Sequence, residues 1–259
     1  MLSPLGTTLV ALAVLTIMGS AVVLHVVVLL RRTPFSLLQT LLLGINYLMT
    51  RVLWRARVVG KFPLGDGEGG VIVSNHRCPA DPTFVYLITS RIVHWMVARE
   101  YCEHPAGRWF FRATESISVG RGGVDTAATK MAIRYVAEGG LVGLFPEGKL
   151  NTTEEVLLPG RRGAAMIALK ARAAVVPCYI EGSPYDGTIL GCLFMPARVE
   201  IRVGPRIDLS EYFESHPDRA VLDSLTERFL SEIARLAKCP NYKPKLAGRK
   251  VVDRSAIKT

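Results

Sequence analysis

A histidine and an aspartate five positions apart are the pair in this chain best suited to acid–base chemistry. His76 and Asp81 lie in the stretch Asn75-His76-Arg77-Cys78-Pro79-Ala80-Asp81, directly after the apolar run Val71-Ile72-Val73. An imidazole titrates near neutral pH, and a carboxylate that binds one ring nitrogen leaves the other free to take a proton. The pattern predicts a general base, His76, oriented by Asp81. The plainer interpretation is a loop histidine beside an aspartate that only caps a helix, and the spacing alone does not exclude it.

Three further motifs follow, each at the edge of an apolar run. They are Ser118-Val119-Gly120-Arg121-Gly122-Gly123, Phe145-Pro146-Glu147-Gly148 and Val175-Val176-Pro177. Arg121 joins a permanent cation to a glycine backbone that can approach an anion closely, so this motif suits a phosphate. The alternative for Arg121 is a surface arginine in a glycine turn. For the Val-Val-Pro motif, plain core packing competes with lining a substrate pocket.

Two other residues near His76 are possible nucleophiles. Ser74 lacks the G-x-S-x-G turn that presents a hydrolase serine, so an inert strand serine is expected. Cys78 is expected to be a small packed thiol. The five cysteines include no C-x-x-C pair and predict neither a disulfide framework nor a zinc site, and no metal is expected.

Charge and hydropathy point to a membrane. The formal net charge is +10, and no Asp or Glu precedes Asp66. A segment from about 7 to 30 carries no charged residue, and as a helix it would be about 36 Å long, enough to span a bilayer. Arg31 and Arg32 close this segment and place the rest of the chain in the cytoplasm by the positive-inside rule. No nucleic-acid motif accompanies the charge, so we expect membrane lipids and not nucleic acid as partners.

A second apolar stretch, about 35–54, ends in basic residues and predicts an amphipathic helix in the membrane interface. An ordinary core-facing helix is the alternative. We therefore expect three parts: a membrane anchor over residues 1–56, a catalytic domain over 57–240, and a basic tail over 241–259.

From about residue 58 onward, short apolar runs alternate with helical stretches. Asp81-Pro82 predicts a helix start with Asp81 as its N-cap, and Asp125 predicts another. Strands that alternate with helices predict an α/β fold with a largely parallel central sheet flanked by helices. The expected strands are Val71–Ser74, Val93–Val97, Ser116–Val119, Leu141–Phe145, Val175–Ile180 and Val199–Val203, and the expected helices are 82–90, 125–137, 163–173 and 219–238. In such sheets ligands bind at the carboxyl ends of the strands, where His76, Gly120 and Glu147 are expected.

Taken in order, the four motifs resemble those of the glycerolipid acyltransferase family, typified by 1-acylglycerol-3-phosphate acyltransferase. The resemblance covers about residues 60–200 and implies transfer of a fatty acyl group from a thioester to a lipid hydroxyl. It implies His76 as base with Asp81 orienting it, and the acceptor phosphate at Gly120, Arg121 and Gly122. Glu147 and Gly148 are implied to bind the substrate as well, Glu147 by holding the acceptor or by ordering the basic residues that hold it. Asn75, Lys149 and Pro177 are further candidates. It implies acyl-coenzyme A or acyl carrier protein as co-substrate and no tightly bound cofactor.

One departure from the family pattern leaves the acceptor open. A threonine usually follows Phe-Pro-Glu-Gly, whereas this chain has Lys149-Leu150-Asn151. The expected product is phosphatidate, made from 1-acylglycerol-3-phosphate. The same chemistry on another lysolipid, an aminolipid or a glycolipid is the alternative. A non-catalytic lipid-binding protein on the same fold is the alternative from another class, and the intact His76, Asp81, Arg121 and Glu147 argue against it.

Overall fold

The structure is a computed structural model that describes residues 16, 20, 35–120, 125–188, 190–214 and 218–248. The chain divides into two compact units, Met1–Gly44 and Ile45–Thr259. The predicted transmembrane segment, about 7–30, lies outside the described residues except for Thr16 and Ser20, and so does most of the predicted basic tail. Within the described ranges, no helix has both the length and the apolar character needed to cross a membrane.

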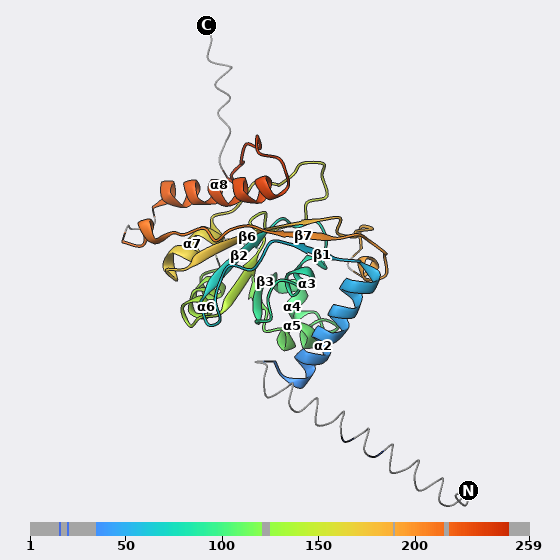
Figure 1. Cartoon of the computed structure of the whole chain (residues 1–259). Helices are drawn as coiled ribbons and strands as arrows, with labels where there is room; N and C mark the ends of the chain where they lie inside the picture. The colour runs from blue at the N-terminus through green and yellow to red at the C-terminus, as the bar shows by residue number, and fades with distance from the viewer. Residues whose placement is uncertain are drawn as a thin grey trace, which may run out of the picture. The chain divides into compact units, whose positions relative to one another are not determined.

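The larger unit is built on a seven-stranded sheet (Figure 1) with the order β1-β7-β6-β2-β5-β3-β4. The strands are β1 (Arg57–Val59), β2 (Gly70–Ser74), β3 (Val93–Ala98), β4 (Ile117–Val119), β5 (Leu141–Leu144), β6 (Ala174–Glu181) and β7 (Glu200–Val203). Every neighbouring pair is parallel except β6 and β7, which are antiparallel. The prediction of an α/β fold with a largely parallel sheet is confirmed, and all six expected strands form with small shifts at their ends.

The helices of the described residues agree less closely with the expected ones. They are α2 (Leu37–Leu48), α3 (Asp81–Val85), α4 (Arg99–Glu103), α5 (Arg108–Ala113), α6 (Thr126–Ala137), α7 (Gly163–Lys170) and α8 (Arg219–Leu236), with short helical turns η1 (Met49–Leu53), η2 (Gly191–Leu193) and η3 (Ser210–Tyr212). The helix expected over 82–90 ends at Val85, so that prediction was too long. The short helices α4 and α5 and the edge strand β1 were not predicted, because five or six residues give too little periodicity.

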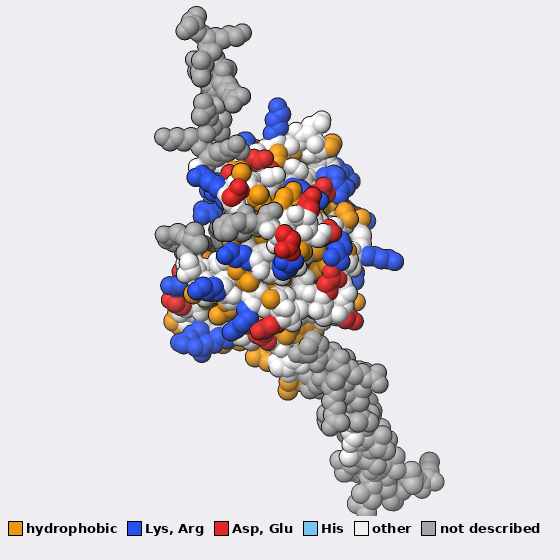
Figure 2. Space-filling view, turned by 90° about the vertical axis from the view of Figure 1, so that its left-hand side faces the viewer, with side chains coloured by type: hydrophobic (Ala, Val, Ile, Leu, Met, Phe, Trp, Pro, Cys, Tyr) orange, Lys and Arg blue, Asp and Glu red, His pale blue; other side chains and the backbone are white. Residues whose placement is uncertain are grey.

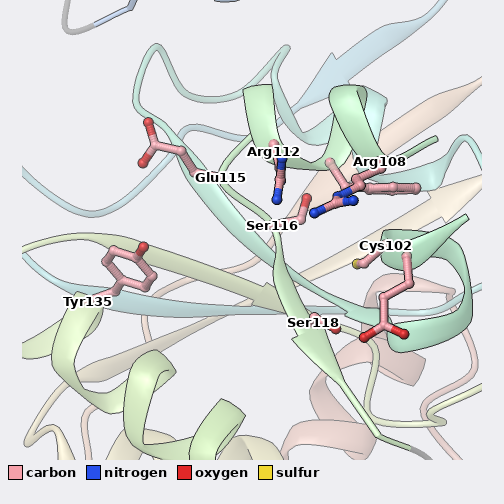
Figure 3. A pocket seen from close by; sticks show the side chains of 9 residues that line it. Cys102, Arg108, Arg112, Glu115, Ser116, Ser118 and Tyr135 are labelled. Carbon is pink, nitrogen blue, oxygen red and sulfur yellow. The ribbon is translucent and has the colours of Figure 1, made fainter. Parts of the chain in front are cut away.

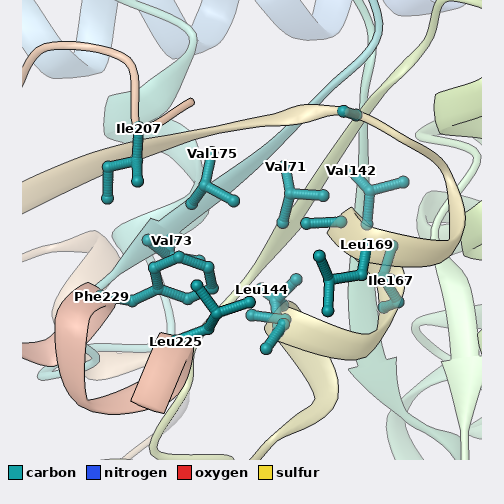
Figure 4. Close-up of a cluster of buried hydrophobic side chains, with 14 of the residues drawn as sticks. Val71, Val73, Val142, Leu144, Ile167, Leu169, Val175, Ile207, Leu225 and Phe229 are labelled. Atoms are coloured by element: carbon teal, nitrogen blue, oxygen red, sulfur yellow. The ribbon is translucent and has the colours of Figure 1, made fainter. Parts of the chain in front are cut away.

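One face of the sheet packs against α6, α7 and α8. Figure 4 shows the valines of β2, β5 and β6 meeting Ile167 and Leu169 of α7 and Leu225 and Phe229 of α8. The two central strands are buried along their whole length, as expected for parallel strands covered on both faces. Each fully buried side chain of this size contributes about 1.5–3 kcal/mol. On one face of the molecule, which Figure 2 shows, Lys and Arg are interspersed with Asp and Glu.

The opposite face of the sheet packs against α3 and the chain around Trp54. Trp54 and Phe84 meet edge to face, with ring centroids 5.1 Å apart. Trp95 of β3 lies over Gly143 of the adjacent β5, and a Cβ added at Gly143 would be 2.8 Å from the indole ring. A glycine is therefore required there so that the indole can lie flat against the sheet. This face also lies under the loops that carry His76 and Phe145.

The loops around α6 are set by a capping aspartate and a glycine with positive φ. Asp125 accepts a hydrogen bond from the Ala128 backbone N–H at 3.0 Å, which confirms it as the N-cap. Gly139 follows the helix at φ +89°, and a Cβ there would meet the Gly67 carbonyl oxygen at 2.4 Å. These residues fix where the chain enters and leaves α6, and so fix how β4 connects to β5.

Candidate active site

The predicted site residues gather at one edge of the sheet. Asn75 and His76 follow β2, Phe145 to Gly148 follow the neighbouring β5, and Gly120 follows the edge strand β4. All three strands are parallel, so these loops leave the sheet at the same edge, where α/β proteins bind their ligands. The convergence expected from the sequence is present in the fold.

Asp81 and Phe145 hold the imidazole ring of His76 in place, and one ring nitrogen remains available. Its Nδ1 lies 3.1 Å from Asp81 Oδ2, and its side chain is 18% exposed. The imidazole stacks on the Phe145 ring at a centroid distance of 3.8 Å and an interplanar angle of 2°. Among the described residues, none hydrogen-bonds to Nε2. With Nδ1 protonated toward the carboxylate, Nε2 carries the lone pair that a general base needs.

Asp81 is completely buried, and four groups contact its carboxylate. Besides His76, Oδ2 accepts hydrogen bonds from the backbone N–H groups of Arg77 at 2.7 Å and Cys78 at 2.8 Å. Oδ1 accepts from the Ser183 hydroxyl at 2.6 Å. The prediction of Asp81 as a helix N-cap was wrong: Ala80 is the N-cap, and the carboxylate turns back to the preceding loop. A carboxylate fixed in this way has one position in which to receive the imidazole.

Glu147 and Asn151 hold the backbone of His76. Glu147 is 2% exposed; its Oε1 accepts from the His76 N–H at 2.9 Å and its Oε2 from the Leu158 N–H at 2.8 Å. The Asn151 N–H donates to the His76 carbonyl at 2.7 Å. Burial raises the pKa of Glu147, and the two backbone hydrogen bonds oppose that shift. Both oxygens face the chain itself, which gives Glu147 the geometry of a loop-ordering residue.

Gly148 and Lys149 form the outer surface of this loop. Gly148 has φ +68°, and a Cβ there would be 2.8 Å from Nε of Arg161, whose side chain lies across it. Lys149 is exposed. Arg161 is also exposed and has no ion pair with another described residue. In the described part of the chain, neither cation has an ion-pair partner.

Gly120 is the described part of the predicted phosphate motif, because Arg121 and Gly122 lie outside the described residues. The Gly120 N–H donates to Asp125 Oδ2 at 2.9 Å, and Arg99 Nη2 lies 2.9 Å from the same oxygen. Hydrogen bonds from Ala128 and Gly120 lower the pKa of the Asp125 carboxyl. A single ionised carboxylate thus joins the end of β4 to the start of α6, on either side of the motif.

Asn75 and Pro177 support the sheet beneath the site. The buried Asn75 amide donates to the Ile180 carbonyl at 2.8 Å and accepts from the Ile180 N–H at 2.7 Å, so it continues the pairing of β2 with β6. Pro177 is buried within β6 beside Val73. A Cβ at Gly204 would meet its ring at 2.8 Å. The two residues help to fix the strand that leads into His76.

The nearby nucleophile candidates are buried. Ser74 is fully buried and donates to Asn75 Oδ1 at 3.2 Å. Burial raises the pKa of the Cys78 thiol far above its usual range and that of Cys178 to about 12. A thiol that stays protonated is a poor nucleophile. In the described part of the chain, no three His, Cys, Asp or Glu side chains come together as metal ligands.

Two supporting contacts were missed by reasoning from the sequence. Ser183 lies 102 positions after Asp81, beyond every motif, and nothing in its surroundings predicts the contact. The Phe145 ring, which stacks on His76, also stacks on Trp95 at a centroid distance of 4.9 Å. The alternation of side chains in β3 shows only which side of the sheet Trp95 faces. The stack of Trp95, Phe145 and His76 depends on how three strands pack together, which the sequence does not show.

A histidine held by a buried carboxylate, at the ligand-binding edge of a parallel sheet, is an arrangement suited to acid–base chemistry. Comparison with known proteins gives the class. Residues 55–181 match the family described as Acyltransferase, and the chain belongs to this family, of the glycerolipid acyltransferase type. The resemblance inferred from the four motifs is confirmed.

Two relatives support the assignment. The chain is 28% identical over 185 residues to a 1-acyl-sn-glycerol-3-phosphate acyltransferase of Bacillus subtilis (strain 168), covering 65% of this chain and 89% of that protein. The fold is similar to the crystal structure of the 1-acyl-sn-glycerophosphate (LPA) acyltransferase PlsC from Thermotoga maritima, with a TM-score of 0.58 and 19% identity. That match covers 78% of this chain and 80% of the other.

Proposed function

We propose that this acyltransferase moves a fatty acyl group from an acyl thioester to the free hydroxyl of 1-acylglycerol-3-phosphate and makes phosphatidate. The observation that carries the proposal is His76, held by Asp81 and Phe145 with Nε2 available at the carboxyl edge of the sheet. The name of the Bacillus relative supports the choice of acceptor.

The reaction follows from the position of the imidazole. His76 Nε2 takes the proton of the lipid hydroxyl as its oxygen attacks the thioester carbonyl carbon, and the Asp81 carboxylate stabilises the imidazolium. The C–O bond forms, the C–S bond breaks, and the thiolate leaves with the proton that His76 held. A thioester is already activated, so no covalent enzyme intermediate is needed. General base catalysis of this kind contributes about 10²–10⁴-fold.

The protein works at a membrane surface in this proposal, with its catalytic domain on the cytoplasmic face. The uncharged segment at 7–30 and the arginines that follow it support this orientation. The second unit adds exposed apolar side chains, namely Ile45, Tyr47, Leu48 and Val52, beside Arg51 and Arg55. Apolar side chains next to cations suit an anionic bilayer interface.

The test is an assay of purified protein with one acyl thioester and a panel of acceptors, with products identified by mass. The panel contains 1-acylglycerol-3-phosphate, other lysophospholipids, an aminolipid and a glycolipid. Phosphatidate as the main product supports the proposal. A different main acylated lipid would refute the acceptor. Thioester binding without any acylated lipid would favour a lipid-binding protein without activity.

A further inference from the structure

A cavity among the described residues lies beside the edge strand β4, and His76 is not part of its lining. It has a volume of about 680 Å³. Its lining comes from α4, α5, β4, the loop before β4 and the end of α6, and includes Arg108, Arg112, Ser116, Ser118 and Tyr135. Ser118 begins the motif that continues through Gly120 to Gly123, but the other residues belong neither to the acid–base pair nor to that motif. The proposed function as stated above gives the cavity no role.

Two arginines face this cavity from one side of α5. Arg108 and Arg112 are one helical turn apart, and Figure 3 shows both guanidinium groups pointing toward Ser116. Neither guanidinium group forms an ion pair or hydrogen bond with another described residue. Like charges at this spacing repel each other by a few tenths of a kcal/mol. An anion bound between them would remove this repulsion.

The two carboxylates at the cavity have other neighbours. Glu103 lies 3.9 Å from Arg99, and Glu115 lies 3.8 Å from His94 Nδ1. The hydroxyl groups of Ser116, Ser118 and Tyr135 add neutral hydrogen-bonding groups. Two arginine forks with hydroxyls nearby are suited to the oxygens of a phosphate.

The position of the cavity fits one particular phosphate. Strand β2 carries His76, and β5 and β3 separate it from β4. At about 4.8 Å per strand, β4 lies roughly 14 Å across the sheet from the strand that leads to His76. The pantetheine arm of a thioester donor separates sulfur from phosphate by about a dozen bonds. This equals about four peptide residues, or roughly 14 Å when extended.

We propose that Arg108 and Arg112 bind the phosphate at the end of the donor's pantetheine arm while its thioester lies at His76. The inference rests on the proposed function, because it needs a thioester donor. Coenzyme A and acyl carrier protein both carry this phosphate. The Gly120–Gly122 motif, which follows β4, remains the site for the acceptor's phosphate in the proposed function.

The experiment compares two small donors, acyl-4′-phosphopantetheine and acyl-pantetheine, which differ only in the phosphate. The wild-type protein is expected to use the phosphorylated donor about tenfold more efficiently in kcat/KM. The double variant R108Q/R112Q should lose this preference, while its KM for the lipid acceptor stays unchanged. The matched control is Arg228→Gln in α8, an exposed arginine outside the cavity that should keep the preference. A variant that keeps the preference, or a wild type without one, overturns the proposal.

A binding measurement separates this inference from the proposed function. Calorimetry with free coenzyme A should show about tenfold weaker binding to the double variant, whichever lipid accepts the acyl group. Unchanged binding contradicts the inference even if phosphatidate is made, whereas weaker binding supports it even if the acceptor proves to be another lipid. Wild-type kinetics with acyl-coenzyme A and with acyl carrier protein identify the source: the natural donor is the one used with the higher kcat/KM, and its use should fall in the double variant.

Discussion

The backbone N–H of His76 donates to Oε1 of Glu147 at 2.9 Å, so a carboxylate from the loop after β5 holds the backbone of the histidine that follows β2. The second oxygen of Glu147 accepts from the Leu158 N–H. Glu147 thus connects His76 to the loop that leads into α7. These contacts fix the backbone position from which the imidazole extends. Because burial raises the pKa of Glu147, we expect their contribution to stability to depend on pH.

Glu147→Gln should lower activity more than tenfold and lower the free energy of unfolding by about 1–3 kcal/mol. The glutamine side chain has one oxygen, which accepts from only one of the two backbone N–H groups. Its NH2 group faces the other N–H, which loses its acceptor. Burial raises the pKa of Glu147 in the folded state, so its contribution to stability is complete below the unfolded pKa and is lost as pH rises through the folded pKa. The stability advantage of wild type over Gln should therefore shrink from mildly acidic to neutral pH. Urea unfolding at both pH values measures it, with the exposed Glu154→Gln as control, and an advantage that grows with pH contradicts this assignment.

Removal of the base or of its orienting group should affect chemistry more than binding. His76→Ala is expected to lower kcat by about 10²–10⁴-fold, and Asp81→Asn to lower it by a similar order, because the imidazolium loses its buried counter-charge. Thiol release from an acyl thioester in the presence of lipid acceptor is the measurement. The exposed His104→Ala is the control and should retain activity. Undiminished turnover of the His76 variant would rule out its role as base.

Arg121→Ala should raise the KM for a phosphate-bearing acceptor at least tenfold and leave that for the thioester donor unchanged. The glycines beside Arg121 let the backbone approach a phosphate, and Asp125 holds the chain on both sides of the motif. Steady-state kinetics with 1-acylglycerol-3-phosphate and with an uncharged lysolipid give the comparison. If the KM for the phosphate-bearing lipid is unaltered, the natural acceptor carries no phosphate at this position.

The sequence predicted what depends on local pattern and failed where distant segments meet. His76, Asp81 and Glu147 were predicted to lie close together because they sit in short motifs next to buried strands, and the structure brings them together. The parallel sheet followed from alternating strands and helices. The direction of the Asp81 carboxylate was predicted wrongly. An aspartate followed by a proline is the usual pattern of a helix N-cap, and the sequence does not show that the carboxylate turns back to the preceding loop instead. Strand β1 was missed because three residues pair only with β7, about 143 positions away. The contact from Ser183 depends on the end of β6, which only the folded sheet places beside α3.

Ser183→Ala should lower kcat about tenfold with little change in either KM. The hydroxyl donates to Asp81 Oδ1 at 2.6 Å, and hydrogen bonds to charged groups contribute about 1.5–3 kcal/mol. Ser183→Thr keeps the hydroxyl and should recover most of the activity. A positioning role also predicts that Ser183→Ala has no further effect in a His76→Ala background, where there is no base left to orient. An additive loss in the double variant would show that Ser183 acts by another route.

Gly143→Ala should reduce both stability and activity although Gly143 touches neither substrate nor His76. A Cβ there would lie 2.8 Å from the Trp95 ring, which stacks on Phe145, and Phe145 in turn stacks on His76. Overpacking of this kind costs about 1–3 kcal/mol and moves the indole, so the displacement reaches the imidazole through two stacked rings. Replacing the indole by a smaller side chain should relieve the clash: in the double variant G143A/W95L, unfolding free energy should recover relative to Gly143→Ala alone. Thermal unfolding and turnover of wild type, G143A, W95L and G143A/W95L measure the coupling between the two positions. Additive effects of the two substitutions would show that the ring stack does not transmit the strain.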